Sequence, residues 1–276
     1  MKKVIVISGI AQGMGREVAH ILAKKNYKIC GFDIDADAIR VLQKELDDVQ
    51  AEHFLQSFDI TDKSAMQSFS DKVIKENQKI DIVVSNVGIG FFGPFEETDL
   101  ERALQCFNIN IIGCARLLQL FIPQMRRQTS GKLIVMSSLV GQIPFPFESI
   151  YSASKFAIEG LVQSLRIEVK PFNIQVALIE PAQVSTNFAA KIHKLPAESS
   201  PYYDRVKRFI KRDEDLIKTA PKPEDAAKRI VTVIEADKPK LFNQVDFMST
   251  VFLFLNRILP HSIRDFILVN HMKIKV

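Results

Sequence analysis

The stretch Val4-Ile-Val-Ile-Ser-Gly-Ile-Ala-Gln-Gly-Met-Gly15 decides the fold class that we predict for this chain of 276 residues. Its apolar first half, rich in β-branched residues, predicts a buried strand. Gly9, Gly13 and Gly15 come next, and an amphipathic helical pattern begins at residue 16. Glycines let the backbone turn tightly and let a pyrophosphate approach the start of a helix. The spacing G-x-x-x-G-x-G is weak alone, but a strand before it and a helix after it are typical of a dinucleotide-binding turn.

Short β-branched runs continue to alternate with helical patterns along the chain. We expect strands at residues 28–32, 54–58, 80–85, 132–136 and 174–179, and helices at 36–46, 64–76, 99–127 and 151–170. Strands that are apolar throughout and separated by helices form parallel sheets with both faces covered. The sequence therefore predicts an α/β protein with a three-layer, doubly wound parallel sheet, which is the Rossmann fold.

The alternation stops after Pro181. Residues 187–218 are polar and basic and show no strand pattern, which is typical of a substrate lid. A helix at 223–235 and a last strand at 241–245 complete the pattern. We therefore expect one domain, with its lid, over residues 1–248.

The remaining residues, 249–276, predict a C-terminal tail of two short amphipathic helices broken at Pro260. Two interpretations of this tail stay open. Its apolar faces either cover the core or a partner subunit, or they make peripheral contact with a membrane.

The composition is that of an ordinary globular protein and excludes several classes. Apolar residues make up 47% and charged residues 25%, and the net charge of +5 is too small to indicate a nucleic-acid partner. The three cysteines show no C-x-x-C spacing, which predicts reduced thiols and a cytoplasmic location. No run approaches 18 apolar residues, so we expect no spanning helix. Metal-ligand clusters and the G-x-S-x-G motif of serine hydrolases are absent from the sequence, so we expect neither.

Asp33 lies 18 residues beyond Gly15, at the end of the second predicted strand. A carboxylate there can accept hydrogen bonds from an adenosine ribose, and it repels the 2′-phosphate that distinguishes NADP. Gln12, which is not basic, precedes Gly13, and no arginine directly follows Asp33. These residues favour NAD over NADP. Asp35 is an alternative for the same role.

Polar and small residues also follow the third and fourth predicted strands. The carboxyl ends of parallel strands meet at one edge of a sheet, so these residues lie on the same edge as the glycine turn. Asp59 can bond an adenine amino group, and Gly88 can let the backbone approach the ribose. Each of them can instead be a helix cap or a turn residue.

Tyr151 and Lys155 are four residues apart in a predicted helix, which places them on one face, one turn apart. An unperturbed phenol has a pKa of about 10 and is a poor base at neutral pH. A neighbouring ammonium stabilises the phenolate and lowers that pKa. The pair can then exchange a proton with an alcohol or a carbonyl group.

Two further polar residues fit this chemistry. Ser138 follows the fifth predicted strand, so its hydroxyl reaches the same edge of the sheet and can hold a substrate oxygen. Asn110 lies in an apolar stretch of the long helix, where a buried amide needs a partner and often holds a water. Such a water can continue a proton path from Lys155 to solvent.

These motifs together resemble the short-chain dehydrogenase/reductase family over residues 1 to about 186. The family's catalytic groups match Asn110, Ser138, Tyr151 and Lys155. The resemblance and the strand ends imply that the cofactor is bound by Gly9, Gln12, Gly13, Met14, Gly15, Asp33, Ile34, Asp59, Ile60, Asn86, Val87, Gly88, Tyr151, Lys155, Pro181, Val184 and Thr186.

The chain departs from the family's pattern at four positions. Ser8 replaces a threonine and keeps its hydroxyl, and Ser85 and Val87 replace the first Asn and the Ala of the N-N-A-G motif. Ala182 replaces a glycine and restricts the backbone after Pro181. None of these changes removes a proton-transfer group.

The resemblance implies reversible hydride transfer with NAD, and dimers or tetramers are common in the family. Tyr151 and its surroundings are similar to those of the hydroxysteroid and retinol dehydrogenase branch. With Ser138 and Tyr151, the apolar residues Phe92, Phe145 and Phe188 predict a pocket for a small hydrophobic secondary alcohol or ketone. A 3-oxoacyl thioester reductase is one alternative, and a catalytically silent NAD-binding regulator is another.

Overall fold

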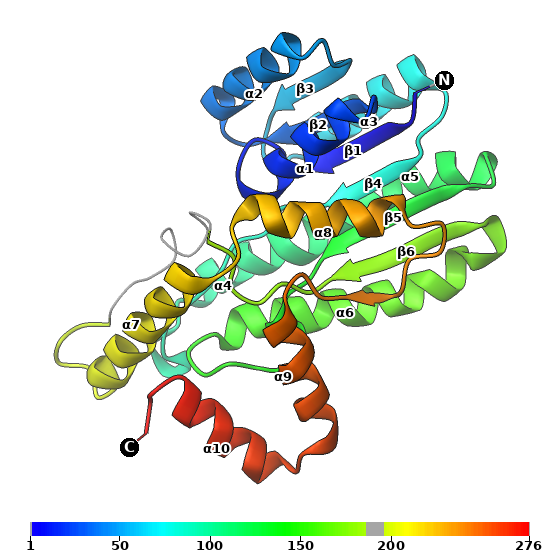
Figure 1. Cartoon of the computed structure of the whole chain (residues 1–276). Helices are drawn as coiled ribbons and strands as arrows, with labels where there is room; N and C mark the ends of the chain where they lie inside the picture. Colours follow the sequence, from blue (N-terminus) through cyan, green and yellow to red (C-terminus); the bar gives the residue numbers. More distant parts are fainter. Residues whose placement is uncertain (1, 186–195, 276) are drawn as a thin grey trace.

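The computed structural model describes residues 2–185 and 196–275. Seven parallel strands form one sheet in the order β3-β2-β1-β4-β5-β6-β7 (Figure 1). The strands are β1 (Val4–Ser8), β2 (Lys28–Asp33), β3 (His53–Ser57), β4 (Ile82–Ser85), β5 (Gly131–Met136), β6 (Ile174–Ile179) and β7 (Phe242–Asn243). The order reverses between β1 and β4, and ligands of such sheets bind at this point. The predicted doubly wound Rossmann fold is confirmed.

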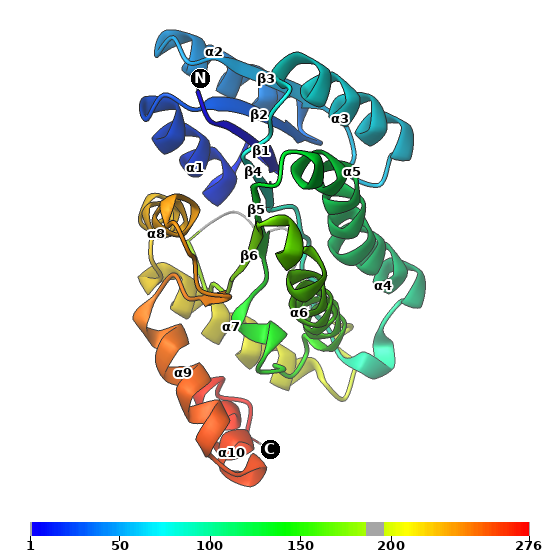
Figure 2. The ribbon, with the colours of Figure 1, turned by 90° about the vertical axis from the view of Figure 1, so that its right-hand side faces the viewer.

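Helices cover both faces of the sheet (Figure 2). One face carries α1 (Gly13–Lys24), α2 (Ala36–Asp48) and α8 (Pro223–Glu235), and the other carries α3 (Lys63–Asn77), α5 (Cys114–Arg127) and α6 (Ser149–Val169). Strand residues alternate between these two layers, because successive side chains of a strand point to opposite faces. Ile5 and Ile7 face α1 and α8, whereas Val4 and Val6 face α3 and α5.

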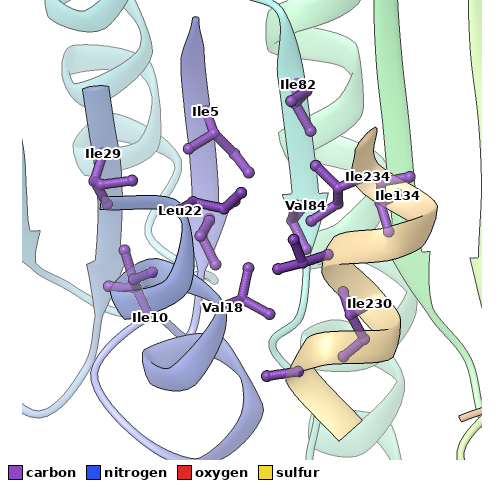
Figure 3. Packing of buried hydrophobic residues seen from close by; sticks show 14 of the residues in the cluster. Ile5, Ile10, Val18, Leu22, Ile29, Ile82, Val84, Ile134, Ile230 and Ile234 are labelled. Carbon is purple, nitrogen blue, oxygen red and sulfur yellow. The ribbon is translucent and has the colours of Figure 1, made fainter. Parts of the chain in front are cut away.

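Figure 3 shows the first of these two cores. Val18 and Leu22 of α1 and Ile230 and Ile234 of α8 lie over the apolar side chains of the central strands. All five residues of β1 are buried, which explains why the first four are apolar and why the fifth, Ser8, has hydrogen-bond partners. The glycine turn at the end of β1 is therefore anchored on a fixed strand.

The predicted helix over residues 99–127 is divided in the structure. It consists of α4 (Leu100–Phe107), one π-helical segment (Asn108–Gly113) and α5. Asn110, in the π-helical segment, bonds the backbone of Ile89 with both ends of its amide. Such π-helical segments occur mostly as local insertions in α-helices, frequently at functional sites.

The combined run Leu100–Arg127 is long and apolar enough to cross a membrane by length and composition, and it is the one such run among the described residues. Packing explains this composition, because Leu117, Leu118 and Phe121 are fully buried against the sheet. The same test is passed by the core helices of soluble proteins, so it is weak evidence for a membrane span.

The predicted lid contains a long helix, α7 (Tyr203–Thr219). Phe188, near the start of the predicted lid, and Thr186, which we predicted to bind cofactor, lie outside the described residues. The last predicted strand is reduced to the two residues of β7.

Two helices, α9 (Phe247–Ile258) and α10 (His261–His271), lie on either side of Pro260 and project beyond the sheet (Figure 1). Leu253 and Met272 are buried in a third cluster with Tyr151. The opposite sides of α9 and α10 expose apolar residues, among them Phe247, Phe254, Ile258 and Phe266.

Candidate active site

The glycine positions of the turn after β1 are unsuited to any residue with a side chain. Gly9 and Gly13 have φ angles of +65° and +53°, which L side chains rarely adopt. A Cβ on Gly15 would lie 2.3 Å from the Gly9 carbonyl oxygen and 2.7 Å from Asn86 Nδ2. The turn therefore brings bare backbone to the start of α1, where the helix dipole and free N–H groups favour a phosphate.

Asp33 holds this turn from the end of β2. Its carboxylate accepts hydrogen bonds from the backbone N–H groups of Ala11 (3.0 Å) and Asp35 (3.1 Å). The alternative residue, Asp35, caps α2 through Ala38 and accepts a hydrogen bond from Gln12 Nε2 at 2.7 Å. Both carboxylates lie at the place where an adenosine ribose is expected, and Asp35 also serves as a helix cap.

The fourth strand is tied to the same turn. Ser8 Oγ accepts hydrogen bonds from the backbone N–H groups of Asn86 and Val87, and Asn86 Nδ2 donates to the Gly9 carbonyl. The hydroxyl at residue 8 thus fixes the ends of β1 and β4 relative to each other. Asp59, by contrast, folds back on its own turn and accepts two hydrogen bonds from Thr61.

A single cavity of about 1230 Å³ runs from the glycine turn to Tyr151. Every described residue that we predicted to bind cofactor lines it except Gly15, which lies against the Gly9 carbonyl within the turn. Phe92, Phe145 and Ser138 line it as well, whereas Asn110 does not. The structure therefore brings the predicted cofactor and substrate residues together in one cavity.

Tyr151 and Lys155 lie in α6, and both are buried. Burial, together with the Glu148 carboxylate, raises the pKa of Tyr151 well above its usual value. A hydrogen bond with Ser138 offsets part of this shift. Lys155 Nζ donates to the Met136 carbonyl at 2.9 Å and lies 5.7 Å from the Tyr151 ring centre. Burial lowers the pKa of Lys155 to about 8. Burial sets the direction of the shift at Tyr151, and the lowering of its pKa by Lys155 stays a prediction.

The amide NH2 group of Asn110 donates its hydrogen bonds to protein groups. Its Nδ2 donates to the Ile89 carbonyl and to Ser154 Oγ, and its Oδ1 accepts from the Ile89 N–H. A Cβ on Gly88 would lie 3.4 Å from Lys155 Nζ and 3.5 Å from Asn110 Oδ1. The two polar groups thus converge on Gly88, where the Asn110 oxygen keeps one lone pair for a further donor.

Two buried acids that our sequence reasoning missed also line the cavity, Glu148 and Asp213. Glu148 directly precedes α6, three residues before Tyr151, and Asp213 lies in α7. Burial and the nearby Asp213 carboxylate raise the pKa of Glu148 well above its usual value. In the sequence, only the position of Glu148 three residues before Tyr151 could have indicated that it belongs to the site.

A second pair of buried acids lies behind the site. Glu159 follows Lys155 by one turn of α6, and Glu180 directly follows β6 and accepts hydrogen bonds from Gln142 and Gln244. Burial and the Glu180 carboxylate raise the pKa of Glu159 to about 7. The spacing of four residues from Lys155 could have indicated this position.

This arrangement is that of a nucleotide-binding oxidoreductase. A sequence model described as short chain dehydrogenase matches residues 3–196. 17-beta-hydroxysteroid dehydrogenase type 1 from Homo sapiens is 29% identical over 259 residues, which cover 87% of this chain and 76% of that protein. Retinol dehydrogenase 8 from Homo sapiens is 30% identical over 257 residues, or 88% of this chain and 81% of that protein. The chain belongs to the short-chain dehydrogenase/reductase family.

Solved structures agree with this assignment. A short-chain dehydrogenase from Streptomyces avermitilis superposes with a TM-score of 0.81 at 27% identity, covering 99% of this chain and 96% of that one. Other structures of the same fold hold NAD in one case and NADP in another. The protein is an oxidoreductase, and the glycine turn fits a nicotinamide dinucleotide because a Cβ would fill the space beside it.

Gly15→Ala is expected to weaken NADH binding about tenfold or more, or about 1.4 kcal/mol, because the added methyl group collides with the Gly9 carbonyl. Fluorescence titration with NADH measures the change. Gly160→Ala, in α6, is the matched control, since its Cβ meets nothing within 4 Å. Equal NADH affinities of the two variants would contradict the role assigned to the glycine turn.

Glu159→Gln is expected to stabilise the fold above neutral pH. The raised pKa means that the folded chain keeps a proton which the unfolded chain loses, so stability decreases as the pH rises from about 4.5 through about 7. At pH 8 the variant should gain on the order of 2–3 kcal/mol over the wild type, and below pH 4.5 nothing. Urea unfolding at both pH values, with the exposed Glu168→Gln as control, decides it.

Proposed function

We propose that this protein transfers hydride reversibly between NAD and a small hydrophobic secondary alcohol or ketone. The observation that carries the proposal is the placement of Tyr151, hydrogen-bonded to Ser138, in the same cavity as the glycine turn. An alcohol whose oxygen reaches both hydroxyls has its carbon beside the part of the cavity that leads to the turn. A cofactor-binding regulator without catalysis would not need this pair.

The residues divide the proton transfer among them. In oxidation Tyr151 Oη accepts the proton of the alcohol O–H, while the C–H bond breaks and its electron pair leaves as hydride. A bound nicotinamide ring supplies the hydride acceptor in oxidation and the hydride donor in reduction. Ser138 Oγ donates to the substrate oxygen and stabilises the negative charge that develops there. Lys155 and Asn110 converge on Gly88, where Lys155 passes the proton to a water that the Asn110 amide holds.

The electrostatics of the chain fit the reductive direction directly. The pKa of Tyr151 is raised, so its hydroxyl stays protonated at neutral pH and can donate a proton to a ketone oxygen. In oxidation the phenolate must form, and added positive charge favours it. The Lys155 ammonium and the charge of an oxidised nicotinamide ring both have the required sign.

Two features support NAD and a hydrophobic substrate. Asp33 lies at the cofactor edge, where a carboxylate repels a 2′-phosphate. Phe92 and Phe145 line the cavity beside Tyr151, and the two human relatives are named for a steroid and for retinol.

The arginines of the lid bear on the alternative of a thioester reductase with an acidic carrier. Arg205, Arg208 and Arg212 of α7 donate hydrogen bonds to backbone carbonyls of residues 271–275. Part of the basic charge that suggested a carrier is thereby directed at the chain's own tail. This observation favours a small free substrate.

Cytoplasmic location, self-association and contact of the tail with a membrane or a partner subunit remain part of the proposal. Three free buried cysteines support a reducing compartment. The exposed phenylalanines of α9 and α10 support a further contact of the tail.

Tyr151→Phe is expected to lower turnover by about 10²–10⁴-fold, because the phenol is the proton-transfer group. NADH titration should show unchanged cofactor affinity, since the lost hydroxyl faces the substrate. A Tyr151→Phe enzyme that keeps the wild-type kcat with a secondary alcohol would overturn the mechanism.

Wild-type enzyme is expected to prefer NAD over NADP in kcat/KM, and Asp33→Asn should reduce that preference about tenfold by removing the repelling charge. Steady-state assays with both cofactors measure the ratio. Asp48→Asn, at the exposed far end of α2, should leave it unchanged. A wild-type preference for NADP would show that the role assigned to Asp33 is wrong.

A further inference from the structure

The cavity of the active site extends between α1 and α2, which lie side by side on one face of the sheet (Figure 2). Its lining there consists of Arg16, Asp33, Asp35, Ala38 and Val41. Asp33 marks the ribose end of the cofactor in the proposed function, so this part of the cavity lies beside the 2′ position of the ribose. A guanidinium group binds phosphate oxygens through two parallel hydrogen bonds, and Arg16 carries the one guanidinium group of this lining.

The start of α1 places Arg16 at this end of the cavity. Arg16 follows Gln12 by one turn, and its backbone N–H donates to the Gln12 carbonyl at 3.4 Å. The side chain of Gln12 reaches the start of α2, where its Nε2 donates to Asp35 at 2.7 Å. Residues four apart share one face of a helix, so Arg16 faces α2 as well, one turn farther from the ribose end.

Glu45, near the end of α2, binds the guanidinium group of Arg16. Arg16 Nε donates to Glu45 Oε2 at 3.1 Å and Nη2 donates to Oε1, so the pair is bidentate. His20, one turn beyond Arg16 in α1, contacts the same carboxylate at 3.0 Å. At a rise of about 1.5 Å per residue, Glu45 is about 15 Å farther along α2 than Asp35. The pair therefore directs the guanidinium group away from the ribose end.

No other described cation lies at the ribose end of the cavity. The basic residues among the described ones that line the cavity are Arg16, Arg102 and Lys155. Arg102 lies against the Phe91 ring and Lys155 donates to the Met136 carbonyl, so both lie toward the catalytic end. The two aspartates at the ribose end carry the charge that repels a phosphate. Arg16 is thus the described side chain that has both the charge and the position to neutralise a 2′-phosphate.

We propose that Glu45 is a specificity-determining residue for the cofactor, because it holds Arg16 away from the place of a 2′-phosphate. This inference rests on the proposed function and adds a second determinant to Asp33. Asp33 repels the phosphate that NADP carries, and Glu45 withholds the cation that would bind it. Without the Glu45 carboxylate, the guanidinium group is free to turn toward the ribose end. NAD has no 2′-phosphate and gains nothing from this change.

The strength of the ion pair sets the size of the effect. The side chains of Arg16 and Glu45 are 35% and 30% exposed, and ion pairs at such exposure are weak enough to exchange partners. A phosphate offers the guanidinium group the same bidentate geometry as a carboxylate, with more negative charge. Carboxylate and phosphate therefore compete for one cation, and removal of the carboxylate shifts the competition by a moderate factor.

The test places Glu45→Gln in the Asp33→Asn background, where the repulsion of NADP is already reduced. Glu45→Gln is expected to raise kcat/KM for NADP about fivefold and to leave that for NAD within about twofold. The gain should appear in KM, because the phosphate is remote from the reacting atoms. Glu76→Gln, an exposed acid of α3 that pairs with Lys72 on the other face of the sheet, is the matched control and should change neither value.

Arg16→Met distinguishes the release of Arg16 from a general loss of negative charge. If Glu45→Gln acts by freeing the guanidinium group, its effect on NADP disappears once Arg16 is replaced. Arg16→Lys keeps the charge without the fork and should retain part of the effect. Turnover with NAD reports that each variant is folded. A gain with NADP that persists in the Arg16→Met background would overturn the inference, and so would the absence of any gain from Glu45→Gln.

Fluorescence titration with NADPH and NADH tests the inference without hydride transfer. In the Asp33→Asn background, Glu45→Gln should bind NADPH about fivefold more tightly, with unchanged affinity for NADH, and added salt should reduce the gain. If this gain is seen in an enzyme that oxidises no secondary alcohol, the proposed function fails and the role of Glu45 stands. If secondary alcohols are oxidised with NAD and the gain is absent, the role of Glu45 fails and the function stands.

Discussion

The close approach of Gly15 to the Gly9 carbonyl is the constraint on which the site depends. A single methyl group would separate them, and the start of α1 would then move away from the end of β1. Asn86 and Ser8 join β4 to the same turn, so the switch point of the sheet is a tightly bonded junction. The cavity begins at this junction, and every residue assigned to hydride or proton transfer is positioned relative to it.

Burial is the second determinant, and it acts against ionisation throughout the site. It raises the pKa of Tyr151, lowers that of Lys155 and raises those of Glu148 and Glu159. Burial therefore favours the neutral form of each of these groups, which is the protonated form of the acids and of Tyr151 and the deprotonated form of Lys155. A charged ligand changes that balance at several groups at once, because these groups lie close enough to influence one another.

Periodicity explains what could be predicted from the sequence. The strands and the glycine turn follow from local patterns, and the pairing of Tyr151 with Lys155 follows from helical spacing. The π-helical segment could not be predicted, because it depends on the Asn110 amide bonding the distant Ile89 backbone. Helix α7 has a polar sequence, and Phe209 is buried only through tertiary partners. Nothing in the sequence indicates that Glu148, which precedes α6, and Asp213 of α7 line the same cavity.

The hydrogen bonds from Arg205, Arg208 and Arg212 to carbonyls at 271–275 link the wall of the cavity to the last described residues. These hydrogen bonds fix helix α7, which lines the cavity through Asp213, to the end of α10 and the segment that follows it. The tail is thus bonded to a helix that lines the cavity, in addition to its own packing against the residues around Tyr151.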